Sequence, residues 1–124
     1  MCIRDRRPTL RVVPHLGSRR YLSLLRVASV LVGNSSSGII EAASFGLPVV
    51  NIGNRQHQRE RSGNVVDVPS GSAAVIAGAI SRALRNGRTS SANVYGDGTA
   101  GEKIVALLAS VPIGPDLLLK SNTY

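Results

Sequence analysis

The stretch VGNSSSGIIEAASFGLPVVNIGNR, from Val32 to Arg55, decides the fold. It continues a short apolar run, Ser29 to Val32, which predicts a strand because buried parallel strands are nearly continuous in apolar residues. A polar loop of small residues follows, and Ile39 to Phe45 then has helical spacing. Gly46, just past its end, is a helix C-cap signal, and Pro48 to Ile52 predicts the next strand. The stretch is therefore predicted to be a strand, a loop, a helix and a second strand.

Further predicted elements lie on both sides of this stretch. In chain order they are a strand at Leu10–Pro14, an amphipathic helix capped by Ser18, a strand at Asn64–Val68, a helix at Ala73–Arg85 and a helix at Lys103–Leu108 capped by Thr99. In the first helix the predicted inward side chains are those of Tyr21, Leu22, Leu24, Leu25 and Ala28.

The order of these elements predicts an α/β fold. Strands that alternate with helices form a parallel, Rossmann-like sheet with helices on both faces. We assign residues 9–111 to this domain, residues 1–8 to a disordered or artefactual start, and residues 112–124 to a C-terminal tail. In that tail, Leu117–Leu119 would need a partner surface.

Composition narrows the class of protein. The 124 residues correspond to about one domain, and the formal net charge is +8. A basic chain could bind nucleic acid, a membrane surface or an anionic metabolite. Base stacking is disfavoured because the aromatic residues are few and scattered, and no apolar run reaches the ~18–20 residues of a membrane helix. The single cysteine, Cys2, cannot form an internal disulfide, so we expect a cytoplasmic protein.

The loop Asn34-Ser35-Ser36-Ser37-Gly38 joins a predicted buried strand to a helix N-terminus. Backbone N–H groups at such a position, with serine hydroxyls, suit a phosphate, and Gly38 would let a ligand approach the backbone closely. The alternative is that these serines only cap the helix. Position alone leaves both interpretations open.

Two charged residues favour a nucleotide at this loop. Glu41 lies in the following helix, and the residue three positions earlier is Gly38, so the usual capping-box pairing is not available to it. A carboxylate near a phosphate loop can instead accept the hydroxyls of a ribose. Arg55 follows the next strand at the same edge of the sheet, where its guanidinium could meet a diphosphate. His15 and His57 have no metal-ligating residues at suitable spacing, so we expect no metal.

The segment GNSSSGIIEAASFGLPVVNIGNRQHQRERSGNVVDV, with NVYGDG downstream, closely resembles the hydrolysing UDP-N-acetylglucosamine 2-epimerases. The resemblance runs from about Val13 to Val111 and rests on the serine cluster, the glutamate, FGLPVVNIGNRQ and YGDG in order. Non-hydrolysing relatives typically have a serine-glycine-glycine loop and a threonine-glutamate-arginine segment. This chain has Ser35-Ser36-Ser37-Gly38 and Asn54-Arg55-Gln56 there, which favours the hydrolysing branch.

The resemblance implies a partial C-terminal domain of the glycosyltransferase-B type, which holds UDP. The positions that match are Ser35 and Ser36 for the diphosphate, with Gly38 in the same loop, Glu41 for the ribose, Arg55 for the nucleotide side of the cleft, and Leu16 and Tyr21 beside the uracil. The implied reaction converts UDP-N-acetylglucosamine and water to N-acetylmannosamine and UDP, through elimination of UDP and hydration of a glycal, in sialic and nonulosonic acid synthesis.

Family members are much longer, and their catalytic acidic residues lie in the N-terminal domain. The resemblance therefore implies that this chain carries no catalytic residue and has no epimerase activity alone. We expect a UDP-sugar substrate, no cofactor, no nucleic-acid or membrane partner, and a homo-oligomeric full-length protein. Two alternatives remain: a fragment of a UDP-sugar glycosyltransferase, and a non-catalytic nucleotide-binding module.

Overall fold

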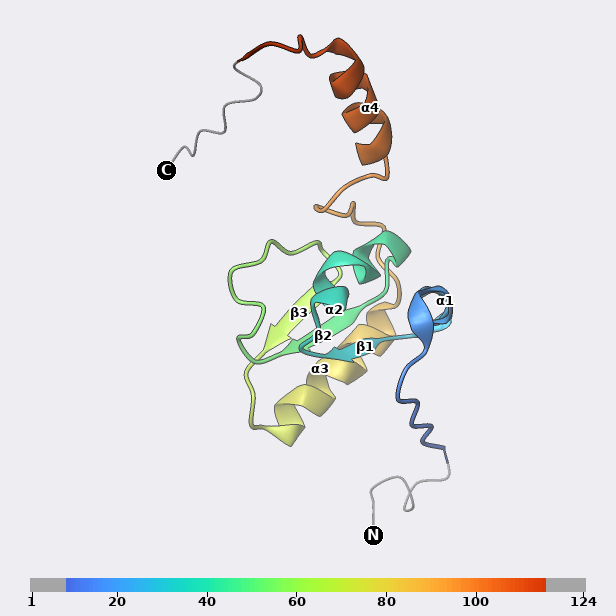
Figure 1. The fold of residues 1–124 in the computed structure, drawn as a ribbon. Helices are drawn as coiled ribbons and strands as arrows, with labels where there is room; N and C mark the ends of the chain where they lie inside the picture. Colours follow the sequence, from blue (N-terminus) through green and yellow to red (C-terminus); the bar gives the residue numbers. More distant parts are fainter. Residues whose placement is uncertain (1–8, 116–124) are drawn as a thin grey trace. The chain divides into compact units, whose positions relative to one another are not determined.

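The computed structural model describes residues 9–115, which fall into two compact units divided between Val94 and Tyr95 (Figure 1). The first unit contains a three-stranded parallel sheet in the order β1-β2-β3. Its elements are α1 (Gly17–Val27), β1 (Leu31–Gly33), α2 (Ser36–Ile40), the 3₁₀ helix η2 (Ala42–Phe45), β2 (Val49–Ile52), β3 (Val65–Val68) and α3 (Ala73–Asn86). The second unit contains α4 (Ala100–Ser110).

Helices cover both faces of the sheet (Figure 1). On one face Val49 of β2 packs with Leu25 of α1 and Ala42 of η2. On the other face its neighbour Val50 packs with Ala79 of α3. This division follows from strand geometry, because successive side chains point to opposite faces. The predicted fold class, a parallel α/β sheet with helices on both faces, is confirmed.

The predicted strand at Leu10–Pro14 is wrong. This segment has no regular secondary structure, and Val12 and Val13 are 58% and 53% exposed. An apolar run becomes a strand only where a neighbouring strand supplies hydrogen-bonding partners. Within residues 9–115 the sheet has three strands, and none pairs with this segment. The strand predicted at Asn64–Val68 is therefore β3, the third of the sheet.

The start of α1 also differs from the prediction. The helix begins at Gly17, so Ser18 already lies inside it and is not the cap. The residue before the helix, Leu16, makes no side-chain cap hydrogen bond. Instead the Gly17 N–H donates to Nδ1 of His15, at 3.2 Å. An imidazole nitrogen thus satisfies one of the N–H groups that a helix start leaves unpaired.

The amphipathic pattern of α1 is only partly as predicted. Leu25 is buried and Tyr21 is half-buried on the same core. Leu22 and Leu24, which were expected to face inward, are 38% and 48% exposed. The prediction assumed a core on a wider stripe of the helix than the described residues provide.

The helix predicted at Ile39–Phe45 is divided in two. α2 ends at Ile40, and the chain continues as η2 with shorter-range hydrogen bonds, such as Ser44 N–H to Glu41 O at 3.1 Å. Such tightening is common at helix C-termini. Gly46 ends this segment in the left-handed conformation, with φ of +58°, which confirms the predicted C-cap.

The later elements follow the sequence pattern closely. β2 and α3 match their predicted ranges to within one residue at each end. Thr99 does precede α4, but its side chain does not cap the helix; its N–H and hydroxyl both donate to Oδ1 of Asp97, at 2.9 and 2.6 Å. The predicted N-terminal start and Leu117–Leu119 lie outside the described residues. In the described part of the chain, no helix is both long and apolar enough to cross a membrane.

Candidate functional site

The candidate site lies where β1 and β2 end. These strands are parallel and Gly33 pairs with Asn51, so their carboxyl ends lie together at one edge of the sheet. The loops that leave the two strands are joined there, because the buried side chain of Gln56 donates from Nε2 to the carbonyl oxygen of Asn34, at 2.9 Å. Ligands of open α/β sheets bind outside the carboxyl ends of the strands. The predicted edge is therefore formed by two loops in direct contact.

The three serines of the first loop have three different roles. Ser35 is the N-cap of α2, and its hydroxyl accepts a hydrogen bond from the Ser37 N–H at 3.3 Å. The hydroxyl of Ser37 contacts that of Tyr21, with an O···O distance of 2.6 Å. Within residues 9–115 the hydroxyl of Ser36 has no hydrogen-bond partner. The capping interpretation thus holds for Ser35. Its hydroxyl oxygen accepts from the Ser37 N–H, and its O–H can still donate to a ligand.

Gly38 has a packing role that its sequence position does not reveal. It is buried, and a Cβ placed on it would lie 3.0 Å from Cγ1 of Val49 and 3.5 Å from Cδ2 of Leu31. The first of these distances is tighter than ordinary van der Waals packing, so a larger residue would require Val49 or α2 to shift. This contact explains the glycine without a ligand, and close approach of a ligand to it stays a prediction.

Glu41 and Arg55 place opposite charges on the two segments that leave the strands. Glu41 stands between α2 and η2, and Arg55 precedes Gln56 in the second loop. Both side chains are exposed, and neither makes an ion pair or hydrogen bond with any described residue. Charged groups held on an anchored backbone but not yet paired are available to a ligand.

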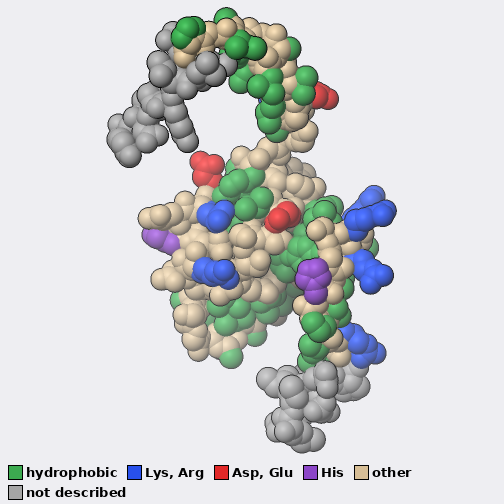
Figure 2. Space-filling model, viewed as in Figure 1, with side chains coloured by type: hydrophobic (Ala, Val, Ile, Leu, Met, Phe, Trp, Pro, Cys, Tyr) green, Lys and Arg blue, Asp and Glu red, His purple; other side chains and the backbone are tan. Residues whose placement is uncertain are grey.

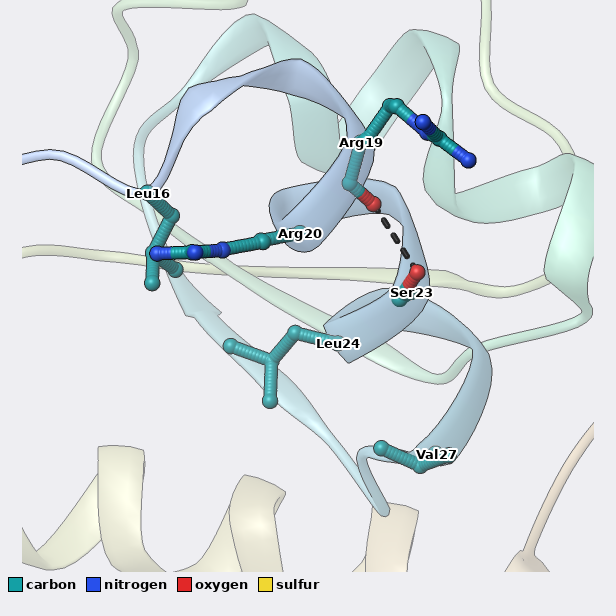
Figure 3. Close-up of a pocket in the computed structure, with 6 residues that line it drawn as sticks. All are labelled: Leu16, Arg19, Arg20, Ser23, Leu24 and Val27. Carbon is teal, nitrogen blue, oxygen red and sulfur yellow. Dashed lines mark hydrogen bonds between the residues drawn. The ribbon is translucent and has the colours of Figure 1, made fainter.

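Leu16 and Tyr21 border an open cavity of about 430 Å³, together with residues of the segment before α1. A second open cavity, of about 650 Å³, lies on the outer side of α1 (Figure 3). There Leu16, Arg20, Leu24 and Val27 project to the same side of the helix. The structure brings Tyr21 to the serine loop through Ser37, whereas Leu16 makes no hydrogen bond to that loop.

Basic side chains lie on both sides of the candidate site. Figure 2 shows them over α1 and over the loop that follows β2. The exposed members are Arg19, Arg20 and Arg26 of α1, and Arg55 and Arg59 of the loop. An anionic ligand would be attracted to this face from either side.

A polar cluster that the sequence analysis missed holds the other end of the second loop. Asn51, buried in β2, donates from Nδ2 to Oδ1 of Asp67 at 2.6 Å, and Arg61 donates from Nε to Oδ2 at 3.0 Å. Partial burial alone would raise the pKa of Asp67, but the hydrogen bonds from Asn51 and Arg61 and the charge of Arg61 lower it below its usual value. An amide in the middle of an apolar strand was a signal, since buried polar groups need partners.

Arg88 is a second residue that the sequence analysis missed. Its guanidinium donates to the carbonyl oxygens of Arg26 and Ala28, both at 2.7 Å, of Leu25 at 3.2 Å and of Phe45 at 2.6 Å. It thereby satisfies carbonyls that the end of α1 leaves unpaired and ties them to η2. A cation is also favourable beside the negative end of a helix.

Comparison with known proteins shows the family of the chain. The family model described as UDP-N-acetylglucosamine 2-epimerase matches residues 2–109, which is most of the chain. The chain belongs to the UDP-N-acetylglucosamine 2-epimerase family. The suspected resemblance is thereby confirmed at the level of the family.

Two relatives of this 2-epimerase family member are hydrolysing enzymes by name. The UDP-N,N'-diacetylbacillosamine 2-epimerase (hydrolyzing) of Legionella pneumophila is 44% identical over 94% of the chain, which spans 31% of that protein's length. The GDP/UDP-N,N'-diacetylbacillosamine 2-epimerase (hydrolyzing) of Campylobacter jejuni is 51% identical over 43% of the chain and 14% of its own length. The polysialic acid biosynthesis protein P7 of Escherichia coli is 43% identical over 49% of the chain and 16% of its own length.

Proposed function

We propose that this chain forms the UDP-holding part of a hydrolysing UDP-sugar 2-epimerase. The observation that carries the proposal is the hydrogen bond from Gln56 to Asn34, which fixes the loops after β1 and β2 against each other. Ser35, Ser36 and Arg55 are within two residues of that bond along the chain. Hydroxyl donors and a guanidinium suit a diphosphate, whose oxygens only accept hydrogen bonds.

Glu41 supplies the complementary group for the ribose. A carboxylate can accept a hydrogen bond from each of two neighbouring hydroxyls, which is how acidic residues hold the ribose in dinucleotide-binding folds. Its side chain is exposed and free of protein partners within residues 9–115, so binding would not first require a bond to be broken. Tyr21 and Leu16 border the cavity in which we place the uracil.

The proposed reaction of the full-length enzyme is elimination of UDP from a UDP-linked 2-acetamido sugar, followed by hydration of the glycal. In this proposal the residues of the present chain hold the leaving group, and none of them is assigned to bond breaking. UDP-N-acetylglucosamine is one candidate substrate, as is a UDP-linked diacetamido sugar of the kind named for the Legionella and Campylobacter relatives. The proposed biological setting is sialic or nonulosonic acid synthesis in the cytoplasm.

The test is a titration of the chain with UDP and with 2′-deoxy-UDP, followed by the amide signals in two-dimensional NMR. Replacement of Glu41→Ala should weaken UDP binding about tenfold to a hundredfold, because a hydrogen bond to a charged group contributes about 1.5–3 kcal/mol. The wild-type chain should prefer UDP to its 2′-deoxy form, and the variant should lose this preference.

Glu102→Ala is the matched control, since Glu102 is an exposed glutamate on α4 in the other unit. It should bind both nucleotides as the wild type does. Equal affinity of wild type and Glu41→Ala for UDP, with the same preference over 2′-deoxy-UDP, would remove Glu41 from the site.

A further inference from the structure

The hydroxyl pair of Tyr21 and Ser37 joins α1 to the serine segment of the candidate site. Its oxygens are 2.6 Å apart, although the two residues are 16 positions apart in the chain and belong to different helices. Both side chains are partly buried. In part-buried surroundings such a bond is shielded from competing water, so it can fix a distance between two elements.

Ser37 is hydrogen-bonded to a residue proposed to bind the diphosphate and to the residue proposed to bind the ribose. Its N–H donates to the hydroxyl of Ser35 at 3.3 Å, on the side of the diphosphate. Its carbonyl oxygen accepts from the N–H of Glu41 at 3.0 Å, on the side of the ribose. The position of Ser37 therefore determines the positions of Ser35 and Glu41 together.

The helix that carries Ser37 is short, although its residues Gly38 and Ile39 are buried. α2 has five residues, and isolated helices shorter than about 12–15 residues are marginal in water. Tyr21 belongs to a different helix, α1, and packs against the core cluster that contains Leu25 and Val49. Its hydroxyl thus adds a contact between α1 and the first turn of α2, beside the burial of Gly38 and Ile39.

We propose that Tyr21 and Ser37 are a positioning pair, which sets the serine loop and Glu41 in the geometry that binds UDP. This inference rests on the proposed function. It assigns the Tyr21 hydroxyl to the protein, whereas the resemblance to the family suggested only that Tyr21 lies beside the uracil. The ring can still border the base while its hydroxyl holds Ser37.

A double-mutant cycle tests the pair. Tyr21→Phe removes only the hydroxyl and keeps the ring in the core, and Ser37→Ala removes the other partner. Each single variant should weaken UDP binding about threefold to tenfold, as expected for one hydrogen bond. The double variant should be no weaker than either single variant, because the bond is already absent in each.

Ser23→Ala is the matched control for the serine substitution. Ser23 lies on α1, and its hydroxyl donates within the same helix, to the carbonyl oxygen of Arg19 at 2.9 Å (Figure 3). This variant should bind UDP as the wild type does. Additive losses in the cycle would show that the two hydroxyls act independently. Single variants that bind UDP like the wild type while unfolding at a lower temperature would show a merely structural pair. Either result would overturn the proposal.

A second readout separates this proposal from the proposed function. Amide hydrogen exchange of residues 36–41 in the absence of ligand should be at least threefold faster in Tyr21→Phe than in the wild type, while that of α3 should not change. If exchange is unchanged, the positioning pair is refuted even where UDP binds. If exchange accelerates but the wild-type chain binds no UDP, the pair does not position a UDP site and the proposed function fails with it.

Discussion

Gly46 offers a sharp test of the packing that surrounds the candidate site. It ends η2 with φ of +58° and ψ of +19°, the left-handed helical conformation. A Cβ at this position would overlap the backbone carbonyl oxygen of Thr89, which a small rotation of a side chain cannot relieve. The Thr89 N–H also donates to the Gly46 carbonyl oxygen, at 2.9 Å. Gly46→Ala should therefore strain both the turn and the segment that follows α3.

The expected loss has two parts. The left-handed conformation costs an alanine about 1–2 kcal/mol relative to glycine. Overpacking against backbone that must move adds typically about 1–3 kcal/mol. Together Gly46→Ala should lower the free energy of unfolding by about 2–5 kcal/mol, a large part of the roughly 5–15 kcal/mol that stabilises an ordinary domain.

Urea unfolding followed by far-ultraviolet circular dichroism measures this loss, since the chain has no tryptophan for fluorescence. Gly17→Ala is the matched control: its φ is +69°, but apart from its chain neighbours and the backbone of its own helix, no atom of the described residues lies within 4 Å of the position of a new Cβ. It should show only the conformational part. Gly46→Asn should be nearly as unstable as Gly46→Ala, because asparagine tolerates the left-handed conformation but still carries a Cβ. Equal losses for Gly17→Ala and Gly46→Ala would contradict the predicted overlap.

Two further predictions concern the polar contacts around the site. The lowered pKa of Asp67 means that its contribution to stability is present above its unfolded pKa of about 3.9 and is lost as the pH falls through the folded value. At neutral pH the wild type should be slightly more stable than Asp67→Asn, and the difference is small because the carboxylate is half-exposed. The difference should vanish at a pH below the folded pKa of Asp67, where the carboxyl is protonated. A difference that persists in acid would contradict the role of its charge. Arg88→Ala should lower the free energy of unfolding by about 1–2 kcal/mol. Arg88→Lys should restore less than half of the lost free energy of unfolding, because one ammonium cannot reach carbonyls of both α1 and η2. Replacement of the exposed Arg82 by alanine is the control. Full restoration by lysine, or an equal loss in Arg82→Ala, would refute the bridging role of Arg88.

The sequence predicted best those elements whose signals are local. β2 is a continuous apolar run, and α3 has helical spacing closed by Gly87, so each could be located without knowledge of the rest of the chain. The left-handed Gly46 was predicted for the same reason. Leu10–Pro14 has an equally good local pattern but forms no strand, because pairing depends on a partner that no local pattern reveals.

The placement of the two loops of the candidate site was predicted, but their contacts were not. The loops after β1 and β2 could be placed at one edge because parallel strands end together. Ser35 caps α2 through a local contact. The role of Ser37 depends on Tyr21, which lies 16 residues away in the chain. The role of Arg88 depends on carbonyls 43 to 63 residues away. Local patterns indicate which residue types are available, but tertiary contacts decide which hydroxyl or guanidinium remains free for a ligand.

The segment that carries the serines and Glu41 is held in place by side chains from other parts of the chain. Tyr21 of α1 contacts Ser37, and Gln56 of the second loop contacts Asn34, so the serine loop is tied on both sides. Because these contacts come from α1 and from the loop after β2, the geometry of the candidate site depends on the first unit and not on residues 33–41 alone. We therefore expect that a change that loosens α1 or the second loop would weaken UDP binding at the proposed site without replacing any residue assigned to UDP.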